Sequence, residues 1–199
     1  MRSSYKMEKA LKDLVIKNRS YRSFKPGVKI APETLKEFVD LARFAPSSVN
    51  LQPLKYKICV SNDDCLTVAS NVKYAKALKG AALPPKGHEP TAYILIFLDT
   101  AISDSLLTFR RDIGIAAQTI MLAAVEKGYG GCMIGNFCSE NICKKLLIPE
   151  RYSLQLILAL GAPDEEIILE AAENGKVGYY RDENFVHHVP KRPLDEMLL

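Results

Sequence analysis

Hydrophobic residues recur every three or four positions along several parts of the chain, which is the spacing of one face of an α-helix. This pattern predicts helices over residues 7–17, 32 to about 46, 63–80, 109–127 and 139–147. Pro32 stands where proline is tolerated at the first helical position, and Ser139 is expected to cap the last of these helices. The helix over 109–127 has the widest apolar face, and Gly128 is expected to end it.

Three other apolar segments have the pattern of β-strands. Residues 54–60 alternate between apolar and polar side chains, which indicates a half-buried strand. Residues 93–98 and 154–160 are almost continuously apolar, as in strands buried on both faces. Residues 130–135 predict a short glycine-rich strand or loop. Because helices outnumber strands and do not alternate strictly with them, we expect an α+β fold with a few-stranded sheet covered by helices.

Two segments follow neither period. Residues 81–91 contain three of the eleven prolines and are expected to form a loop. From Gly175 onward the chain is polar and aromatic without a clear period, and we expect this tail to dock on another surface, such as a partner subunit. With 199 residues and no internal repeat, the chain is expected to form a single domain over 1–199.

Composition and charge narrow the classes of function. Hydrophobic residues make up 48% of the chain and charged residues 25%, which excludes wholesale disorder. The 27 Lys and Arg against 23 Asp and Glu leave a net charge of +4, too small for a nucleic-acid binder driven by bulk charge. The apolar runs are too short for a membrane span, and residues 1–20 lack the apolar stretch of a signal peptide. We therefore expect a cytoplasmic protein without nucleic-acid or membrane partners.

Hydrolytic and metal chemistry have little support in the sequence. The five cysteines are odd in number and form no C-x-x-C pair, so we expect reduced thiols rather than disulfides or a zinc site. His88, His187 and His188 lie in a loop and in the tail, with no triad or metal partner nearby in the sequence. Contacts with anions and amides are the chemistry that remains.

Two basic segments could hold a phosphate. Arg19 and Arg22 flank Ser20 and Tyr21, and two guanidinium groups with a hydroxyl between them suit a phosphate group. Lys191-Arg192 near the end of the chain could bring further positive charge to the same anion. The alternative interpretations are a solvated basic helix end for the first segment and a frayed basic tail for the second.

Two further segments could contact a flat ligand. Residues 46–53 place Ser, Asn and Gln side chains between two prolines, where they could bind the edge of a planar heterocycle. Residues 128–136 contain four glycines within eight positions, which lets the backbone approach a ligand or another chain. A turn between a helix and a strand, and a tightly packed strand, are the alternatives. Asp112 is expected only to favour the start of its helix.

Together these segments resemble the FMN-dependent nitroreductase family. The family's R-S-x-R-x-F segment corresponds to Arg19–Phe24, and its A-P-S-x-x-N-x-Q-P loop to Ala45–Pro53. Its D-x-G-x-A-A-Q helix corresponds to Asp112–Gln118, its G-x-G-x-x-x-I-G segment to Gly128–Gly135, and its basic pair to Lys191-Arg192. The five motifs stand in the family's order and extend over nearly the whole chain. The resemblance implies a three-layer α-β-α fold, a mostly antiparallel sheet and an intertwined homodimer.

The resemblance also implies roles for residues at the matching positions. Arg19, Ser20, Arg22 and Arg192 would hold the FMN phosphate, together with Lys191. The residues near the flavin ring or ribityl chain would be Asn50 and Gln52, with Ile134, Gly135 and Asn136 along the ring. The other subunit would contribute Pro46, Ser47 and Ser48. Leu54 and Met133 replace the tryptophans of many members, so we expect a different substrate pocket.

The activity implied by the resemblance is that of an oxidoreductase. Hydride would pass from NADH or NADPH through flavin N5 to a nitroaromatic, a quinone or a related small acceptor, by a ping-pong mechanism. Reductive dehalogenation or flavin cleavage on the same fold is an alternative. A non-catalytic flavin- or nucleotide-binding protein is another, as is an α+β domain whose arginines and glycines are all structural.

Overall fold

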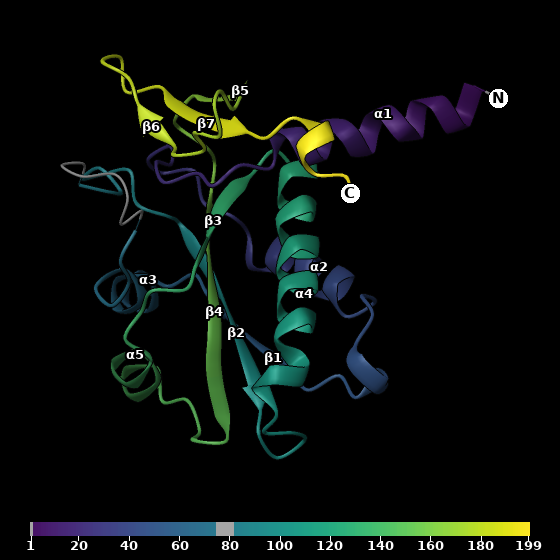
Figure 1. Ribbon diagram of the computed structural model, residues 1–199. Coiled ribbons are helices and arrows are strands. Elements are labelled where there is room, and N and C mark those ends of the chain that lie inside the picture. Colours follow the sequence, from purple (N-terminus) through teal and green to yellow (C-terminus); the bar gives the residue numbers. More distant parts are fainter. Residues whose placement is uncertain (1, 75–81) are drawn as a thin grey trace.

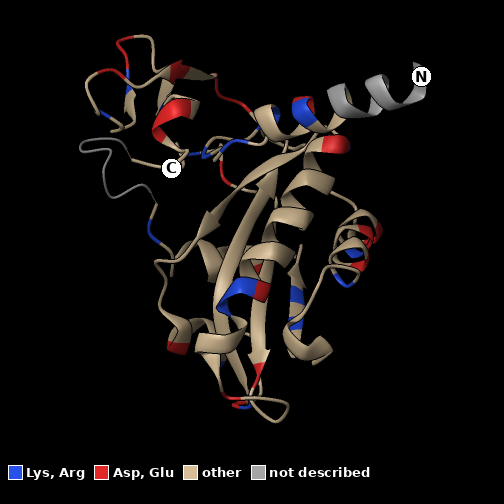
Figure 2. Cartoon of the chain, turned by 45° about the vertical axis from the view of Figure 1, so that its right-hand side comes forward, with Lys and Arg blue, Asp and Glu red and all other residues tan. Residues whose placement is uncertain are grey.

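An antiparallel four-stranded sheet forms the centre of the molecule (Figure 1), in a computed structural model that describes residues 2–74 and 82–199. Its order is β1 (Leu54–Cys59), β2 (Ala92–Asp99), β4 (Tyr152–Gly161) and β3 (Gly130–Ile134). Every position of β2 is buried because helices cover both faces of the sheet. In Figure 2, β2 and β4 are almost free of charged residues. The predicted α+β class and all four predicted strands are confirmed.

Alternate residues of β2 supply the two hydrophobic cores of the domain. On one face, Ile94 and Ile96 pack with α2 (Pro32–Ala42) and α4 (Leu106–Glu126). On the other face, Tyr93 and Leu95 pack with residues of α3 (Asn62–Ala69) and α5 (Ser139–Lys145). Figure 1 shows the two helix pairs on opposite sides of the sheet. The predicted three-layer α-β-α arrangement is confirmed.

A bulge in β4 accommodates the one polar residue of its apolar run. Ile96 of β2 pairs with Leu156 and Phe97 pairs with Leu154, so Gln155 has no partner in the register. Its amide Nε2 donates to the backbone oxygen and the hydroxyl of Ser153, at 3.1 and 2.7 Å. The extra residue lets β4 keep apolar side chains toward both cores on either side of the bulge.

Two predictions about helices are wrong. The helix predicted over 63–80 ends at Ala69, because Val72 forms an antiparallel bridge with Phe137 that draws the chain into an extended conformation. The rest of that prediction lies partly outside the described residues, at 75–81. Ser139 is the first residue of α5 and not its cap, and Cys138 precedes it without a capping hydrogen bond from its side chain.

The first helix, α1 (Arg2–Lys17), leaves the body of the domain near the C-terminal end of α4 (Figure 1). It begins earlier than the hydrophobic pattern predicts. Among the described residues, no helix has both the length and the hydrophobicity needed to cross a bilayer.

A second, small sheet lies beyond one end of the first (Figure 1). Its order is β5 (Ile167–Ala171), β7 (His187–Lys191) and β6 (Tyr180–Arg181), with β5 and β7 parallel. The segment that was expected to be an aperiodic tail therefore pairs within its own chain as far as Lys191. Two single-turn 3-10 helices, Ser48–Asn50 and Leu194–Glu196, complete the described elements.

Candidate functional site

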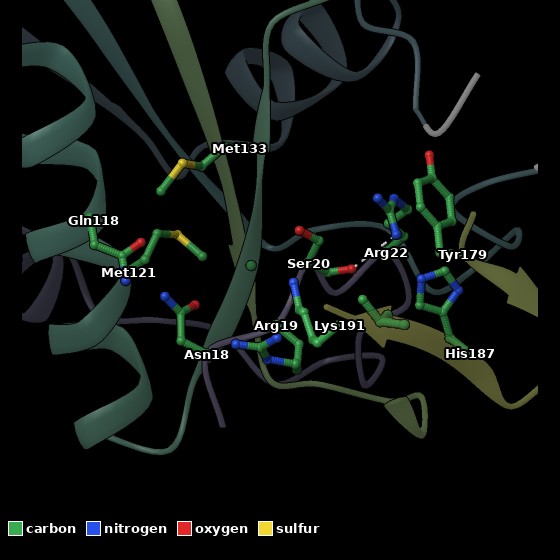
Figure 3. A pocket seen from close by; sticks show the side chains of 12 residues that line it. Asn18, Arg19, Ser20, Arg22, Gln118, Met121, Met133, Tyr179, His187 and Lys191 are labelled. Atoms are coloured by element: carbon green, nitrogen blue, oxygen red, sulfur yellow. Dashed lines mark hydrogen bonds between the residues drawn. The ribbon is translucent and has the colours of Figure 1, made fainter. Parts of the chain in front are cut away.

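A cavity of about 330 Å3 lies where the end of α1, the C-terminal half of α4, β3 and the small sheet meet (Figure 3). Three of its lining residues are cationic, and none of the described residues that line it is acidic. The lining residues are Asn18, Arg19, Ser20, Arg22, Gln118, Met121, Gly131, Met133, Tyr179, His187, Val189 and Lys191. The cavity thus unites the predicted phosphate residues Arg19, Ser20, Arg22 and Lys191.

The segment from Arg19 to Arg22 is held against β3 by backbone contacts. Ser20 pairs with Gly131 in a parallel bridge, and the N–H of Tyr21 donates to the Gly131 carbonyl oxygen at 2.9 Å. The Arg19 Nη2 donates to the carbonyl oxygen of Val15 at 2.8 Å, at the end of α1. These bonds fix the segment where α1 ends, so that its side chains line the cavity.

Both arginines have hydrogen-bonding capacity to spare inside the protein. Arg22 is 8% exposed, and its Nη1 donates to the carbonyl oxygen of Ser20 at 3.1 Å. Its guanidinium carbon lies 5.6 Å from the centre of the Tyr179 ring. The Nε atoms of Arg19 and Arg22 are buried and have no hydrogen-bond partner in the described parts of the chain. Burial lowers the pKa of Arg19 because it disfavours the charged guanidinium, and an anion beside the side chain would favour the charged form.

Glu165 links this segment to the small sheet. Its carboxylate accepts the backbone N–H of Arg22 and, at 3.2 Å, that of Ser23. The same carboxylate forms an ion pair with Arg181 of β6, and its side chain is only 4% exposed. One buried carboxylate therefore connects the arginine segment to β6.

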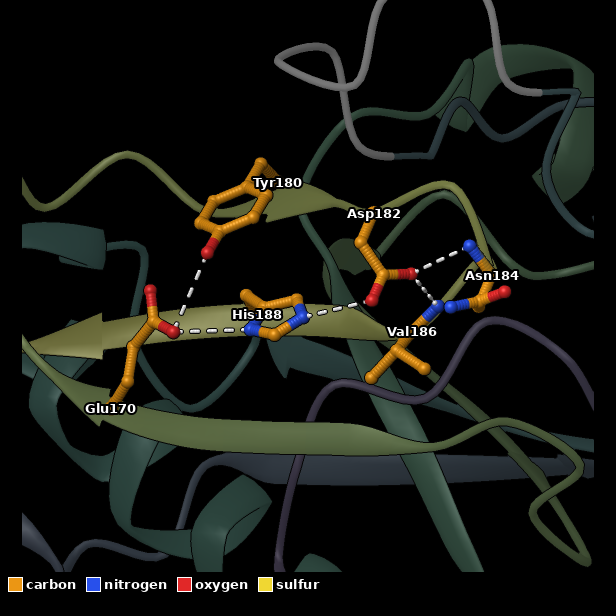
Figure 4. A network of polar contacts seen from close by, with 6 residues as sticks. All are labelled: Glu170, Tyr180, Asp182, Asn184, Val186 and His188. Carbon is orange, nitrogen blue, oxygen red and sulfur yellow. Dashed lines mark hydrogen bonds and ion pairs between the residues drawn. The ribbon is translucent and has the colours of Figure 1, made fainter.

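The strand β7 forms one wall of the cavity, and every second side chain of the strand lines it. His187, Val189 and Lys191 line the cavity, as expected for alternate residues on one face of a strand. The neighbouring His188 contacts Glu170 of β5 at 3.0 Å and Asp182 at 3.3 Å (Figure 4). Its hydrogen bond with Glu170 raises the pKa of His188, and this network joins the three strands of the small sheet.

A second cavity, of about 160 Å3, is lined by three of the site residues predicted in the loop over 46–53. Pro46, Ser47 and Gln52 line it together with residues of α2, β1 and α4. Asn50 accepts a hydrogen bond from the Gln52 Nε2 on its side-chain oxygen at 3.1 Å. None of these residues lines the first cavity within one chain.

The loop over 46–53 is held by Asp112, which corrects the expectation that this residue only favours a helix start. Asp112 lies in the second turn of α4 and is 4% exposed. Its carboxylate accepts the hydroxyls of Ser47 and Ser48 at 2.7 and 3.0 Å, and the Ser48 N–H at 2.9 Å. Three bonds to one buried carboxylate stabilise a loop in which Val49, Asn50 and Gln52 have positive φ.

We expect Asp112→Ala to lower the free energy of unfolding by about 2–3 kcal/mol, since it removes hydrogen bonds to a charged group and leaves buried donors unpaired. Urea unfolding followed by circular dichroism measures the change. Asp104→Ala is the matched control, because Asp104 is exposed just before the same helix and its side chain forms no hydrogen bond or ion pair with the described residues. Equal stability of the two variants would show that the carboxylate does not hold the loop.

The remaining predicted site residues lie outside both cavities. Ile134 is buried in the core between the sheet and α5, whereas Gly135 and Asn136 are exposed after the end of β3. Arg192 follows β7 and forms an ion pair with Glu196 at 2.9 Å. The sequence did not identify Gln118, Met121, Tyr179 or His187 as cavity residues. The one signal for His187 was its alternation with Val189 and Lys191.

Comparison with known proteins identifies a family to which most of the chain is similar. The family model described as the nitroreductase family matches residues 15–162. The Bacillus subtilis proteins YdgI and MhqN bear provisional names as NAD(P)H nitroreductases. YdgI is 28% identical over 74% of this chain and 86% of its own length, and MhqN is 27% identical over 77% and 88%.

Solved structures show the same likeness. An FMN-dependent nitroreductase from Clostridium difficile is 25% identical, with a TM-score of 0.61 over 81% of this chain and 91% of that protein. A Desulfovibrio desulfuricans nitroreductase-like structure in complex with FMN shares the fold, with 23% identity and a TM-score of 0.68 over 96% of this chain and 95% of that one. Since the family model extends over most of the domain and includes four of the five motifs, the chain belongs to the nitroreductase family.

Proposed function

We propose that this protein is an FMN-dependent oxidoreductase that takes hydride from NADH or NADPH and reduces a small acceptor such as a nitroaromatic or a quinone. Two guanidinium groups with buried, unpartnered Nε atoms, on residues that line one cavity, carry the proposal. Membership of the nitroreductase family supports it, as do the FMN named for the Clostridium and Desulfovibrio structures and the NAD(P)H named for the Bacillus proteins.

The residues present fit the phosphate end of FMN. Arg19, Arg22 and Lys191 bring positive charge to the cavity, and Ser20 adds a neutral hydroxyl donor. We propose that these four side chains hold the phosphate. Arg192 could join them only by giving up its ion pair with Glu196, which is exposed and therefore weak.

When bound, FMN supplies the hydride chemistry, and the chain supplies binding, orientation and exclusion of water. Gln118 offers an amide to the rest of the ligand, while Met121 and Met133 offer polarisable apolar surface. Backbone groups of Ile134, Gly135 and Asn136, and the side chains of Asn50 and Gln52, are proposed to contact the ring or ribityl chain. In a ping-pong reaction the electron donor and the acceptor would use the same cavity in turn.

We further propose that the protein is a homodimer in which Pro46, Ser47 and Ser48 of one subunit complete the site of the other. These residues lie away from the first cavity within one chain, as a shared site requires. Apolar side chains exposed on α1, on this loop and at the C-terminus support a two-fold interface; they include Leu11, Val15, Val49, Leu194, Met197 and Leu198. The C-terminal residues after Lys191 are proposed to dock on the partner.

The proposed function is tested by the absorbance spectrum of the purified protein, before and after anaerobic addition of NADH and then NADPH. We expect a flavin band that bleaches with at least one nicotinamide and returns when a quinone or nitroaromatic is added. A flavin band that persists with both donors would reject nicotinamide-dependent reduction and leave a flavin-binding protein. No band, even after incubation with FMN, would reject the flavin assignment.

We expect Arg22→Ala to weaken FMN binding by roughly 10- to 100-fold, because a charge-assisted hydrogen bond contributes about 1.5–3 kcal/mol. Flavin fluorescence titration of the FMN-free protein measures the dissociation constant. Binding of riboflavin, which lacks the phosphate, should change little. The exposed cation Lys36 on α2 provides the control variant Lys36→Ala, which should bind FMN like the unaltered protein. Unchanged FMN affinity in Arg22→Ala would contradict the phosphate assignment.

A further inference from the structure

His187 is a buried polar side chain whose role the family resemblance leaves open. It begins β7, is 2% exposed and lines the cavity together with Lys191. Its backbone N–H donates to the carbonyl oxygen of Glu166 at 3.0 Å, which fixes the start of the strand. Figure 3 shows its ring beside Tyr179, on the same side of the cavity as Arg22, and the two ring centres are 5.4 Å apart.

The imidazole has hydrogen-bonding capacity that the protein leaves unused. Its Nδ1 is buried and has no hydrogen-bond partner among residues 2–74 and 82–199. Buried polar atoms are nearly always paired, so an unpaired one in a side chain that lines a cavity calls for an explanation. Packing against Tyr179 explains the position of the ring, but an apolar side chain of similar size would pack there without leaving a nitrogen unpaired.

The charges that face His187 are positive. Burial first, and then Arg22, Arg181 and His188, lower the pKa of His187 to about 4. Lys191 adds a cation on the same face of β7, and Glu165 is already paired with Arg181. The ring is therefore neutral at pH 7, with one N–H donor and one acceptor nitrogen. A neutral donor among several cations suits a multiply charged anion, because it adds a hydrogen bond without adding repulsion between cations.

We propose that His187 is a further phosphate-binding residue, whose neutral ring donates an N–H to the phosphate group held by Arg19, Ser20, Arg22 and Lys191. This inference rests on the proposed function and extends it to the small sheet. The phosphate would thus be held from two sides, by the segment after α1 and by β7. Glu165 connects that segment to Arg181 of β6, the strand that pairs with β7.

The test compares the binding of FMN and of riboflavin by FMN-free protein carrying His187→Leu or His187→Asn. We expect His187→Leu to bind FMN about 5- to 10-fold more weakly while its riboflavin affinity stays within about twofold, since one hydrogen bond to a charged group is lost. His187→Asn keeps an N–H donor and should recover part of the FMN affinity. Riboflavin binding serves as the control for folding, because a misfolded variant would lose both ligands.

A second measurement does not depend on the leucine variant. The chain has three histidines, so the ring signal of His187 in a proton NMR spectrum is identified by its loss in His187→Asn. We expect inorganic phosphate to shift this signal in the FMN-free protein and to shift it much less in Arg22→Ala.

The outcomes separate this inference from the proposed function. Unchanged FMN affinity in His187→Leu would overturn the role of His187, and so would equal losses of affinity for FMN and riboflavin. A His187 ring signal that does not shift when phosphate is added would overturn it as well. If Arg22→Ala still loses FMN in that case, the proposed function stands. Failure of the unaltered protein to bind FMN would overturn both.

Discussion

Glu165→Ala is expected to lower the free energy of unfolding by about 3–5 kcal/mol, the cost of removing one partner of a buried ion pair. Arg181 would keep its charge at 13% side-chain exposure without a partner, and the backbone N–H groups of Arg22 and Ser23 would lose their acceptor. Urea unfolding of the FMN-free protein measures the loss. The effect exceeds that expected for Asp112→Ala because a buried cation is left uncompensated as well as the donors.

The neighbouring carboxylate provides the control for this prediction. Glu166 is exposed, and among the described residues its one contact of this kind is made by its backbone oxygen, which accepts the His187 N–H. Glu166→Ala should therefore change the free energy of unfolding by less than about 0.5 kcal/mol. Glu165→Ala should also weaken FMN binding more than it weakens riboflavin binding. The arginine segment would lose its link to Arg181, and the proposed phosphate residues would no longer be held in place. Similar stability for the two variants would show that the ion pair does not join the arginine segment to the small sheet.

The elements that the sequence predicted are those whose local pattern and tertiary environment agree. The strand β2 is apolar at almost every position because both of its faces are covered, and α4 has a wide apolar face because it packs along the sheet. The segment proposed to bind phosphate was recognisable because Arg19, Ser20 and Arg22 are close in sequence and line one cavity. Local information was sufficient in each of these cases.

The small sheet could not be predicted in the same way. Its strand β6 has two residues, and β5 pairs in parallel with β7 although 15 residues lie between them. Short, half-exposed strands carry almost no periodic signal. The contacts that connect this region, Glu165 with Arg181 and His188 with Glu170, join residues 16 and 18 positions apart. His187 therefore appeared to be a tail histidine without a partner.

Asp112 shows the same limit inside a correctly predicted helix. An aspartate near a helix start is usually exposed and favours the N-terminal dipole, which is what the sequence suggested. Its burial and its three hydrogen bonds arise because the loop with Ser47 and Ser48 crosses α4 at that turn. These contacts join residues more than 60 positions apart, so they depend on the fold and cannot be predicted from a local sequence pattern.

Gly131→Ala is expected to lower the free energy of unfolding by about 3 kcal/mol, the upper range of overpacking in a closely packed interior. A Cβ atom at this position would lie 2.1 Å from the backbone oxygen of Ala159, and 2.9 Å from the side chain of Leu160. The backbone oxygen belongs to β4 in the centre of the sheet and cannot rotate away, so β3 itself must move. Thermal and urea unfolding measure the loss.

The same displacement should weaken FMN binding, because the Gly131 carbonyl oxygen accepts the N–H of Tyr21 and thereby holds the arginine segment. We expect FMN affinity to fall further than that of riboflavin, since the segment carries the proposed phosphate contacts. Gly178→Ala is the control: a Cβ atom there meets nothing within 4 Å, so stability should change by less than about 0.5 kcal/mol. A Gly131→Ala protein that is destabilised but binds FMN normally would mean that the arginine segment keeps its position independently of β3, and that Glu165 alone is sufficient to hold it.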